Sequence, residues 1–381
     1  MESFRINYLL PFAGRTGGTR VLLNFMNELS KMGHEVSMTT LHYNKWFPLS
    51  SDVEIISKKT YIDAAYFWEM SRMLKSKRIL LNVSMLNKLN SIIQKNDINV
   101  ATFAQTAYLA SWRSLEGSTP FYHMQHFETI FFEDPQMKKF ISDTYFLPIY
   151  KIANSSWLRD KLLELTGHNF KVVNPAIEHE YFYPRIKEMK KERETVDKIN
   201  IVALGKGGWK NAVGIYNAVK NVKTSGCNKN IVLHYFGHTP PKSIPFDGKF
   251  TVFHKDLSDG DLALLYSDSD IQITFSTAES FPLPPLEAMA CGSSVITTPY
   301  GTEDYAVNEE NALIVEPNNV DMLTQKIKTL VDNEELRNKL RENGIKTAKR
   351  YNYKDQAKIL ELEMKVALDE NAKKNMRFKI L

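Results

Sequence analysis

Two glutamates, Glu279 and Glu287, stand at the two ends of a proline-rich stretch that follows an apolar run. The prolines and Gly292 bracket a short helix, which puts Glu279 in the loop at the carboxyl end of a strand and Glu287 one to two turns into the helix. One carboxylate then reaches deep into a cleft and the other reaches nearer its mouth. Hydrogen bonds to vicinal sugar hydroxyls are a natural use of such a pair, although two unrelated glutamates would show the same spacing.

Two glycine-rich loops, each between an apolar run and a helical pattern, offer groups that an anion would meet. The loop GKGGWK carries Lys206 and Lys210, whose ammonium groups could pair with a diphosphate as point charges. The loop AGRTGGT carries Gly17 and Gly18, which would let the backbone approach an anion or a sugar at the start of a helix. The lysine loop lacks the Walker A spacing, and the other lacks the dinucleotide spacing G-x-G-x-x-G. Solvated surface lysines and a plain tight turn are the alternatives.

The elements that must position these loops alternate between short apolar runs and helical patterns. Strands are expected at 4–10, 35–40, 53–56, 98–103, 120–124 and 149–153, and again at 199–204, 231–236, 250–253, 271–275, 295–298 and 312–315. This alternation predicts an α/β fold with two Rossmann-like, doubly wound domains whose parallel sheets are covered on both faces. Ligands bind at the carboxyl ends of such strands, so the default site is a central cleft that both domains face.

The length and composition agree with two soluble domains. The chain has 381 residues, of which 43% are hydrophobic and 24% charged, and its net charge of +5 is too small to name a partner. The two cysteines exclude a disulfide framework and a cysteine-rich zinc site. The charged run PRIKEMKKERETVDK at 184–198 breaks the alternation and is predicted to be a linker between a domain over 1–183 and a second over 199–354.

For several other patterns the sequence favours a structural explanation over a functional site. Asp268 and Asp270 form a D-x-D pattern at the amino end of a strand, which is the wrong end for a metal in the active site. His123 and His126 have no third ligand with supporting spacing. The aromatic and basic residues of 61–78 could bind nucleic acid or lipid, but a packed loop is commoner. Neither a secretory signal nor a transmembrane segment is expected. The basic end of the chain is read as a solvated helix end, with a peripheral membrane contact as the alternative.

The sequence resembles the retaining, nucleotide-sugar-dependent glycosyltransferases of family 4, which have the GT-B fold. The resemblance spans nearly the whole chain and is most specific in its second half. The matching segments are FAGRTGGTRVLLNFMNELSKMGHEV, IVALGKGGWKN, the E-x7-E block ESFPLPPLEAMACGSSVITT, and PYGTEDYAVNEENALIVEPNN. The segments YHMQHFET and TYFLPIYKIANSSWL are similar to the bacterial rhamnosyltransferase branch.

The resemblance implies a role for each matching position. Glu279 would contact the transferred sugar and Glu287 the ribose, while Lys206 and Lys210 would neutralise the pyrophosphate and stabilise the leaving diphosphate. Gly17 and Gly18 would let the first loop approach the diphosphate and sugar, and His126 would stand at the reacting face of the sugar. Further substrate contacts are expected from the start of the short helix, at Ser280, Phe281 and Leu283. The resemblance also implies that no metal or cofactor is needed and that a last helix, over about 355–381, joins the first domain.

This sequence departs from the family pattern at two places. Lys206 stands where the family usually has arginine, and lysine cannot make the bidentate fork of a guanidinium. Pro282 stands where the family has a second glycine, and Pro284 and Pro285 follow, so these positions have no backbone N–H to offer. The diphosphate is therefore expected to depend more on Lys206 and Lys210 than on this helix start.

The predicted activity is transfer of a hexose from a UDP, GDP or dTDP sugar to a saccharide or glycolipid acceptor, with retention, in glycan or polysaccharide assembly. The resemblance implies a cytoplasmic enzyme, with the inner face of the membrane as an alternative place, and no nucleic-acid partner. Three other readings stay open. They are a GT-B nucleotide-sugar epimerase or phosphorylase-like transferase, a non-catalytic glycosyltransferase-like binding protein, and a nucleic-acid binder with salt-dependent affinity.

Overall fold

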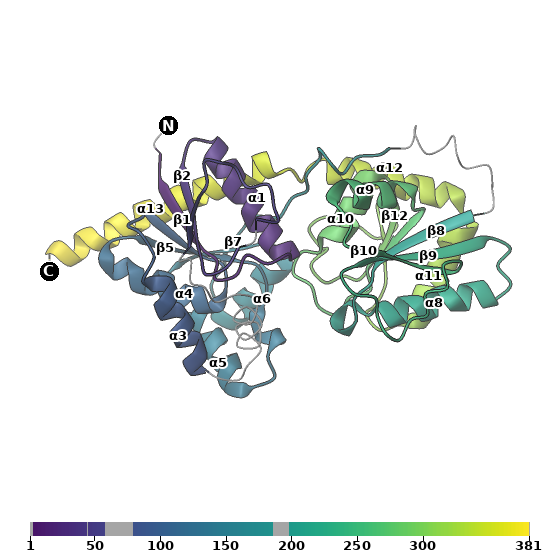
Figure 1. The fold of residues 1–381 in the computed structure, drawn as a ribbon, viewed down its shortest axis with the longest axis horizontal. Helices are drawn as coiled ribbons and strands as arrows, with labels where there is room; N and C mark the ends of the chain where they lie inside the picture. The colour runs from purple at the N-terminus through teal and green to yellow at the C-terminus, as the bar shows by residue number, and fades with distance from the viewer. Residues whose placement is uncertain (1–2, 44, 58–78, 186–197, 381) are drawn as a thin grey trace. The chain divides into compact units, whose positions relative to one another are not determined.

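The computed structural model describes residues 3–43, 45–57, 79–185 and 198–380 (Figure 1). The chain forms two compact units, each built on its own parallel sheet. Unit 1 comprises Met1–Asn174 together with Tyr353–Leu381, and unit 2 comprises Pro175–Asn352. Within the described residues, no helix combines the length and the apolar character that crossing a bilayer requires.

Unit 1 holds a seven-stranded sheet in the order β3-β2-β1-β4-β5-β6-β7, in which every neighbouring pair is parallel. The chain starts at the centre and winds outward in both directions, which is the doubly wound arrangement. Its strands are β1 (Arg5–Leu9), β2 (Glu35–Thr40), β3 (Glu54–Ser57), β4 (Ile98–Ala101), β5 (Thr119–Met124), β6 (Tyr150–Ala153) and β7 (Lys171–Val172).

Helices cover both faces of this sheet. Three of them, α4 (Ala104–Arg113), α5 (Pro135–Thr144) and α6 (Ser156–Thr166), pack on the face that carries Leu9, Tyr122 and Met124, beside α3 (Ile79–Asn90). On the other face α1 (Gly17–Lys31) packs against α13 (Tyr353–Ile380). Figure 1 shows α13, in yellow, along this sheet although it ends the sequence.

Unit 2 holds a six-stranded parallel sheet in the order β10-β9-β8-β11-β12-β13. Its strands are β8 (Lys198–Leu204), β9 (Asn230–Gly237), β10 (Thr251–Lys255), β11 (Ile271–Ile273), β12 (Ser294–Thr297) and β13 (Leu313–Ile314). The helices α8 (Ala212–Thr224) and α11 (Val320–Asp332) cover one face of this sheet. A second group is formed by α10 (Leu283–Cys291), which packs against α9 (Asp259–Asp268) and α12 (Glu334–Ala348). Buried aliphatic side chains such as Ile201, Leu233 and Ile327 form the core between the sheet and the helices α8 and α11.

The predicted α/β class is confirmed, and every predicted strand is present with its ends displaced by at most a few residues. The two-residue β7 was not predicted, because a run this short gives no alternation to detect. The first glycine loop differs from its prediction. Gly17 and Gly18 form the first turn of α1 and not the loop before it, and the Thr16 hydroxyl caps this turn by accepting from Thr19 N at 3.2 Å.

The predicted linker at 184–198 falls almost entirely outside the described residues, as does the aromatic and basic segment 61–78. The division between the units lies earlier, after Asn174. Residues 175–183 belong to unit 2 because they pack there. Ile177 pairs with Asn352 in a β-bridge, Phe182 is fully buried beside Tyr266, and Tyr183 O accepts a hydrogen bond from Ser267 Oγ at 3.4 Å.

Candidate active site

The strand order of unit 2 reverses between β8 and β11, which makes the carboxyl ends of these strands the expected place for a ligand. The loop after β8 contains the short helix η3 (Gly208–Lys210), and the loop after β11 runs to the start of α10. The two loops are joined directly, because the backbone N–H of Thr277 donates to the carbonyl of Trp209 at 2.8 Å. Lysine and glutamate side chains from loops distant in the sequence are thereby brought to one place.

Lys210 and Glu279 form an ion pair at this point, with Lys210 Nζ donating to Glu279 Oε1. Glu279 is only 7% exposed and Lys210 is partly buried. A carboxylate this far from water needs a partner, because burial of an isolated charge is costly. The sequence predicted both residues for the site but not their contact. An ammonium and a carboxylate in one cluster can meet a phosphate and a hydroxyl of the same ligand.

Lys206 lies on the exposed side of the same loop. Its Nζ is 4.8 Å from the centroid of the Trp209 ring, which is a cation–π distance. Gly205, beside it, is needed for packing, since a Cβ there would lie 2.9 Å from the Phe253 ring. The ammonium of Lys206 is therefore carried by a loop that sits tightly on β9 and β10.

Glu287 occupies the middle of α10, is 5% exposed, and accepts a hydrogen bond from the Tyr266 hydroxyl at 3.3 Å. The residues at the start of α10, Ser280, Phe281 and Leu283, are also buried. The Phe281 ring packs between Tyr305 and Tyr351, with centroids 5.2 and 5.8 Å away. The Phe281 side chain is thus part of the core, and the backbone of this segment is what remains for a ligand.

A small pocket lies beside the ion pair, at the carboxyl ends of β8 and β11. Its lining includes Lys210, Ser276 and Pro282. The Ser276 hydroxyl is buried, and no described residue forms a hydrogen bond with it. Sequence reasoning missed Ser276 because a serine after a strand is too common to carry a signal. In the structure it places a neutral donor in the same pocket as an ammonium group.

The loop after β12 supports the Glu279 loop from behind. Gly301 has φ of +70°, and a Cβ on it would lie 2.3 Å from the Ser280 carbonyl oxygen. Thr298 Oγ1 donates to the Ser276 carbonyl at 2.8 Å. Sequence reasoning missed these positions as site residues. A glycine in a turn directly after a strand was the available signal for a close backbone approach.

In unit 1 the predicted site residues lie at the carboxyl ends of two different strands. Gly17 and Gly18 follow β1, and outside their own helix turn no described residue has an atom within 4 Å of where a Cβ would be. His126 follows β5, is half-buried, and packs on Phe131 with ring centroids 4.6 Å apart. Among the predicted site residues of unit 2, Lys210 and Glu279 are brought into direct contact, whereas those of unit 1 are in two loops.

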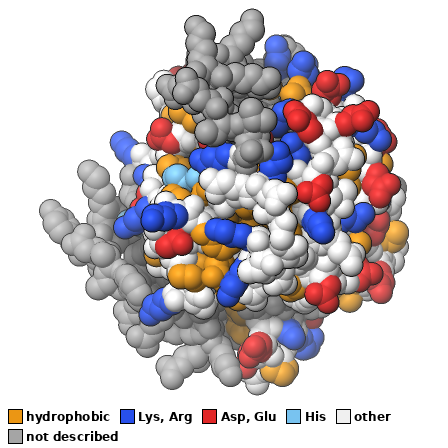
Figure 2. Space-filling model, turned by 90° about the vertical axis from the view of Figure 1, so that its right-hand side faces the viewer, with side chains coloured by type: hydrophobic (Ala, Val, Ile, Leu, Met, Phe, Trp, Pro, Cys, Tyr) orange, Lys and Arg blue, Asp and Glu red, His pale blue; other side chains and the backbone are white. Residues whose placement is uncertain are grey.

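The patterns that the sequence indicated to be structural have structural partners. Asp268 Oδ2 accepts from Asn200 Nδ2 at 2.9 Å, and Asp270 Oδ2 accepts from Asn200 N at 2.9 Å, so this D-x-D pair holds the start of β8. Among the described residues, no group of three or more His, Cys, Asp or Glu side chains could hold a metal ion. Both basic and acidic side chains are visible on the face in Figure 2.

His123 is not part of the site. It lies in β5 with its ring fully buried and edge-on to Phe25 of α1 at 5.2 Å. No described residue forms a hydrogen bond with either ring nitrogen, and burial lowers the pKa of His123 to about 3. The folded protein therefore keeps this imidazole neutral at a pH where an exposed histidine is charged.

Replacing His123 with phenylalanine is expected to reduce the loss of stability in acid. Below about pH 6.5 the unfolded chain protonates this histidine and the folded chain does not, so wild type loses about 1.4 kcal/mol per pH unit relative to His123→Phe until the folded pKa is reached. Urea unfolding at pH 7 and pH 5 measures the difference, with the exposed His168→Phe as control. Parallel pH dependence of wild type and His123→Phe would show that the interpretation is wrong.

The two parallel, doubly wound sheets define the GT-B fold, and solved structures of GT-B glycosyltransferases share it. Sucrose-phosphate synthase from Thermosynechococcus elongatus superposes with a TM-score of 0.74 at 14% identity, covering 95% of this chain and 99% of that one. Anabaena HepE, solved in complex with UDP-glucose, superposes with a TM-score of 0.70 at 13% identity, covering 95% of this chain and 100% of that one.

Sequence comparison points to the same class of protein. Residues 248–347 match the family model described as Glycosyl transferases group 1, and this segment contains Glu279, Glu287 and Gly301. An uncharacterised glycosyltransferase of Methanocaldococcus jannaschii is 38% identical over 79 residues, which are 20% of this chain. The matched part spans only 22% of the length of that relative.

Proposed function

We propose that this protein is a retaining glycosyltransferase of family 4 that transfers a hexose from a nucleoside diphosphate sugar to an acceptor hydroxyl without a metal ion. The observation that carries the proposal is the Lys210–Glu279 ion pair at the point where the strand order of unit 2 reverses. Glu279 of this pair lies within the segment that matches the group 1 family, and Lys210 lies before it. The donor class is further supported by HepE, whose structure holds UDP-glucose. Assembly of a glycan or polysaccharide, in the rhamnosyltransferase-like branch, is the setting we infer.

The ion pair offers a simple way to receive the donor. When the diphosphate enters, Lys210 Nζ can transfer its interaction from Glu279 to a phosphate oxygen, and Glu279 then accepts hydrogen bonds from the sugar hydroxyls. Lys206 adds a second ammonium group, so negative charge that develops on the leaving diphosphate is stabilised where it forms. The Ser276 hydroxyl, in the same pocket, supplies a neutral donor. We assign Glu287 to the ribose and His126 to the acceptor side of the reaction.

Because of the prolines at the start of α10, we infer that the diphosphate is bound more by side chains than by backbone N–H groups. Pro282, Pro284 and Pro285 provide no N–H, so the backbone donors of this segment are those of Phe281, Leu283 and Leu286. A retention mechanism on one face of the sugar, in which the leaving phosphate helps to deprotonate the acceptor, fits a site that is rich in lysine. Lys206 and Lys210 then hold the phosphate close to the acceptor hydroxyl that loses its proton.

Binding of a nucleoside diphosphate is expected to raise the melting temperature. A ligand at 100 times its Kd adds about 2.7 kcal/mol to the stability of the native state, so a thermal-shift screen of UDP, GDP, dTDP and their hexose conjugates identifies the donor. Glu287→Ala should weaken the shift given by the nucleotide, and the exposed Glu335→Ala should not. If none of these compounds changes the melting temperature at millimolar concentration, the proposed donor class is wrong.

Product analysis then separates transfer from the alternatives. A transferase releases free nucleoside diphosphate when an acceptor is supplied, apart from slow hydrolysis. An epimerase changes the sugar with no acceptor present, and a binding protein gives the thermal shift without any product.

A further inference from the structure

The loop that carries His126 is fastened by a buried carboxylate. Glu128 begins the short helix η2 (Glu128–Phe131), and its Oε1 and Oε2 accept from the backbone N–H of Ala104 at 3.1 and 3.0 Å. Oε1 also accepts from the Tyr122 hydroxyl at 2.8 Å. The backbone N–H of Glu128 donates to the Tyr145 hydroxyl at 2.9 Å. These contacts tie the loop after β5 to the start of α4, to β5 itself and to the end of α5.

Ala104 is the first residue of α4, whose N-cap residue is Phe103. A phenylalanine has no side-chain acceptor for the free N–H groups of a helix start, and a carboxylate at this end also interacts favourably with the helix dipole. Glu128 therefore performs, from another loop, the capping that the sequence of α4 does not provide. The clamp joins the loops after β4 and β5, which are neighbours at the carboxyl edge of the sheet.

Burying the Glu128 carboxylate costs free energy, because the charged form loses its contact with water. Glu128 is 6% exposed, and burial raises its pKa to about 7 despite the hydrogen bonds that favour the ionised form. A neutral cap, such as serine or threonine at position 103, would satisfy the same helix end at lower cost. A buried titratable group held beside a candidate site residue is more often found where it serves function than elsewhere.

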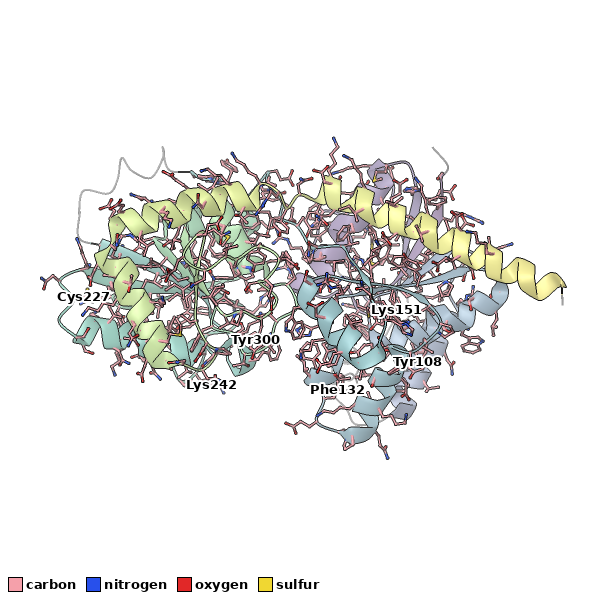
Figure 3. All side chains as sticks on the ribbon, turned by 180° about the vertical axis from the view of Figure 1, so that it is seen from behind. Tyr108, Phe132, Lys151, Cys227, Lys242 and Tyr300 are labelled. Carbon is pink, nitrogen blue, oxygen red and sulfur yellow. The ribbon has the colours of Figure 1, made fainter. Side chains whose placement is uncertain are left out.

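The clamp is one of the contacts that hold the loop carrying His126. On either side of Glu128 the chain is held by the core, because Phe127 and Phe132 both pack into the cluster around Tyr122. Figure 3 labels Phe132 together with Tyr108 of α4. Between these anchors Ile130 and Phe131 are 43% and 47% exposed, and Phe131 packs on the His126 ring. The Glu128 contacts thus leave a small apolar surface exposed, with the imidazole against it.

We propose that Glu128 is a positioning residue, which fixes the His126–Phe131 pair in place for the acceptor. This inference rests on the proposed function for its catalytic part, since it assumes that His126 works on the acceptor side. The other part, that Glu128 fixes the position of the His126 ring, does not depend on the proposed function. The two parts can therefore be tested separately in the full-length chain.

The position is tested by NMR of protein labelled with ¹³C in the histidine rings. The Phe131 ring shifts the His126 resonances, which a His126→Gln variant assigns. Glu128→Gln keeps the shape but removes the charge, and Glu128→Leu removes the hydrogen bonds as well. We expect the His126 resonances to move toward those of an exposed histidine in Glu128→Leu, and partly so in Glu128→Gln. The exposed Glu133→Gln, in the same loop, should leave them unchanged. Unchanged His126 resonances in both Glu128 variants would overturn the proposal.

The catalytic part is tested with UDP-glucose as the probe. We expect Glu128→Gln to lower UDP release at least tenfold while the thermal shift given by UDP stays as in wild type, because the hydrogen bonds of Glu128 given above are to residues of unit 1. Full UDP release by Glu128→Gln would contradict the catalytic part. Wild type that binds no nucleotide would instead overturn the proposed function and, with it, the catalytic part, whereas the NMR experiment still decides the position.

Discussion

Alanine at Lys210 is expected to lower turnover of a nucleotide-sugar donor by about 10²- to 10³-fold, which is the usual effect of removing one group that stabilises charge developing in the transition state. The loss should appear mainly in kcat, because the ammonium group matters most when the diphosphate leaves. Lys206 remains in this variant, but it supplies only one of the two ammonium groups assigned to the diphosphate, so it does not replace the contact of Lys210. Release of nucleoside diphosphate from the donor, followed with and without acceptor, measures the effect.

The same substitution has a second consequence that must be separated from the first. Lys210→Ala leaves Glu279 buried without its ion-pair partner, which should lower the free energy of unfolding by about 1–3 kcal/mol. The double variant Lys210→Ala with Glu279→Gln removes the unpaired charge. It should recover most of this stability and none of the turnover. Lys220→Ala, on the exposed face of α8, is the matched control. Full turnover by Lys210→Ala would remove the basis of the proposed mechanism.

Gly301→Ala is expected to lower the free energy of unfolding by about 3 kcal/mol or more. The left-handed backbone costs alanine about 1–2 kcal/mol, and forcing an atom into filled space adds a similar amount. Here the new Cβ would lie 2.3 Å from the carbonyl oxygen of Ser280, so the backbone beside Glu279 has to move. Activity should therefore fall even in the fraction of protein that stays folded.

Gly248→Ala is a close control for the strain. Its φ is also +70°, but apart from its two neighbours in the chain no described residue has an atom within 4 Å of where a Cβ would be. The free energy of unfolding of Gly248→Ala should therefore fall only by the cost of the left-handed backbone for alanine, about 1–2 kcal/mol. Urea unfolding of both variants measures the difference between them. Equal losses would show that the loop after β12 does not support the Glu279 loop as described.

The strands could be predicted because each is a short apolar run between polar turns, as β8 and β11 show. The carboxyl-edge position of Glu279 followed from that order alone. The contacts could not be predicted, because they join distant positions. Lys210 and Glu279 are 69 residues apart, and Glu128 reaches Ala104 across 24 residues. A single sequence gives no sign that such side chains meet.

The start of α1 shows a different limit. The sequence predicts a loop at Gly17 and Gly18, because paired glycines permit positive φ and a close backbone approach, yet the Thr16 cap and the buried residues that follow stabilise a first helical turn there. Local preference was overridden there by capping and packing. The burial of the Phe281 ring between two tyrosines likewise depends on residues that are far along the chain.

The place of α13 sets the order in which this protein can be completed during its synthesis. Unit 1 includes residues on both sides of unit 2 in the chain, whereas unit 2 is one continuous segment between them. Tyr150 donates a hydrogen bond to Glu363 at 2.6 Å across 213 residues, and Asn371 donates one to Thr119 at 3.1 Å across 252 residues. Domains usually mature from the N-terminus as the chain emerges. In this chain the second unit can finish first, while one face of the first sheet, which α1 covers only in part, remains incomplete until α13 has been translated.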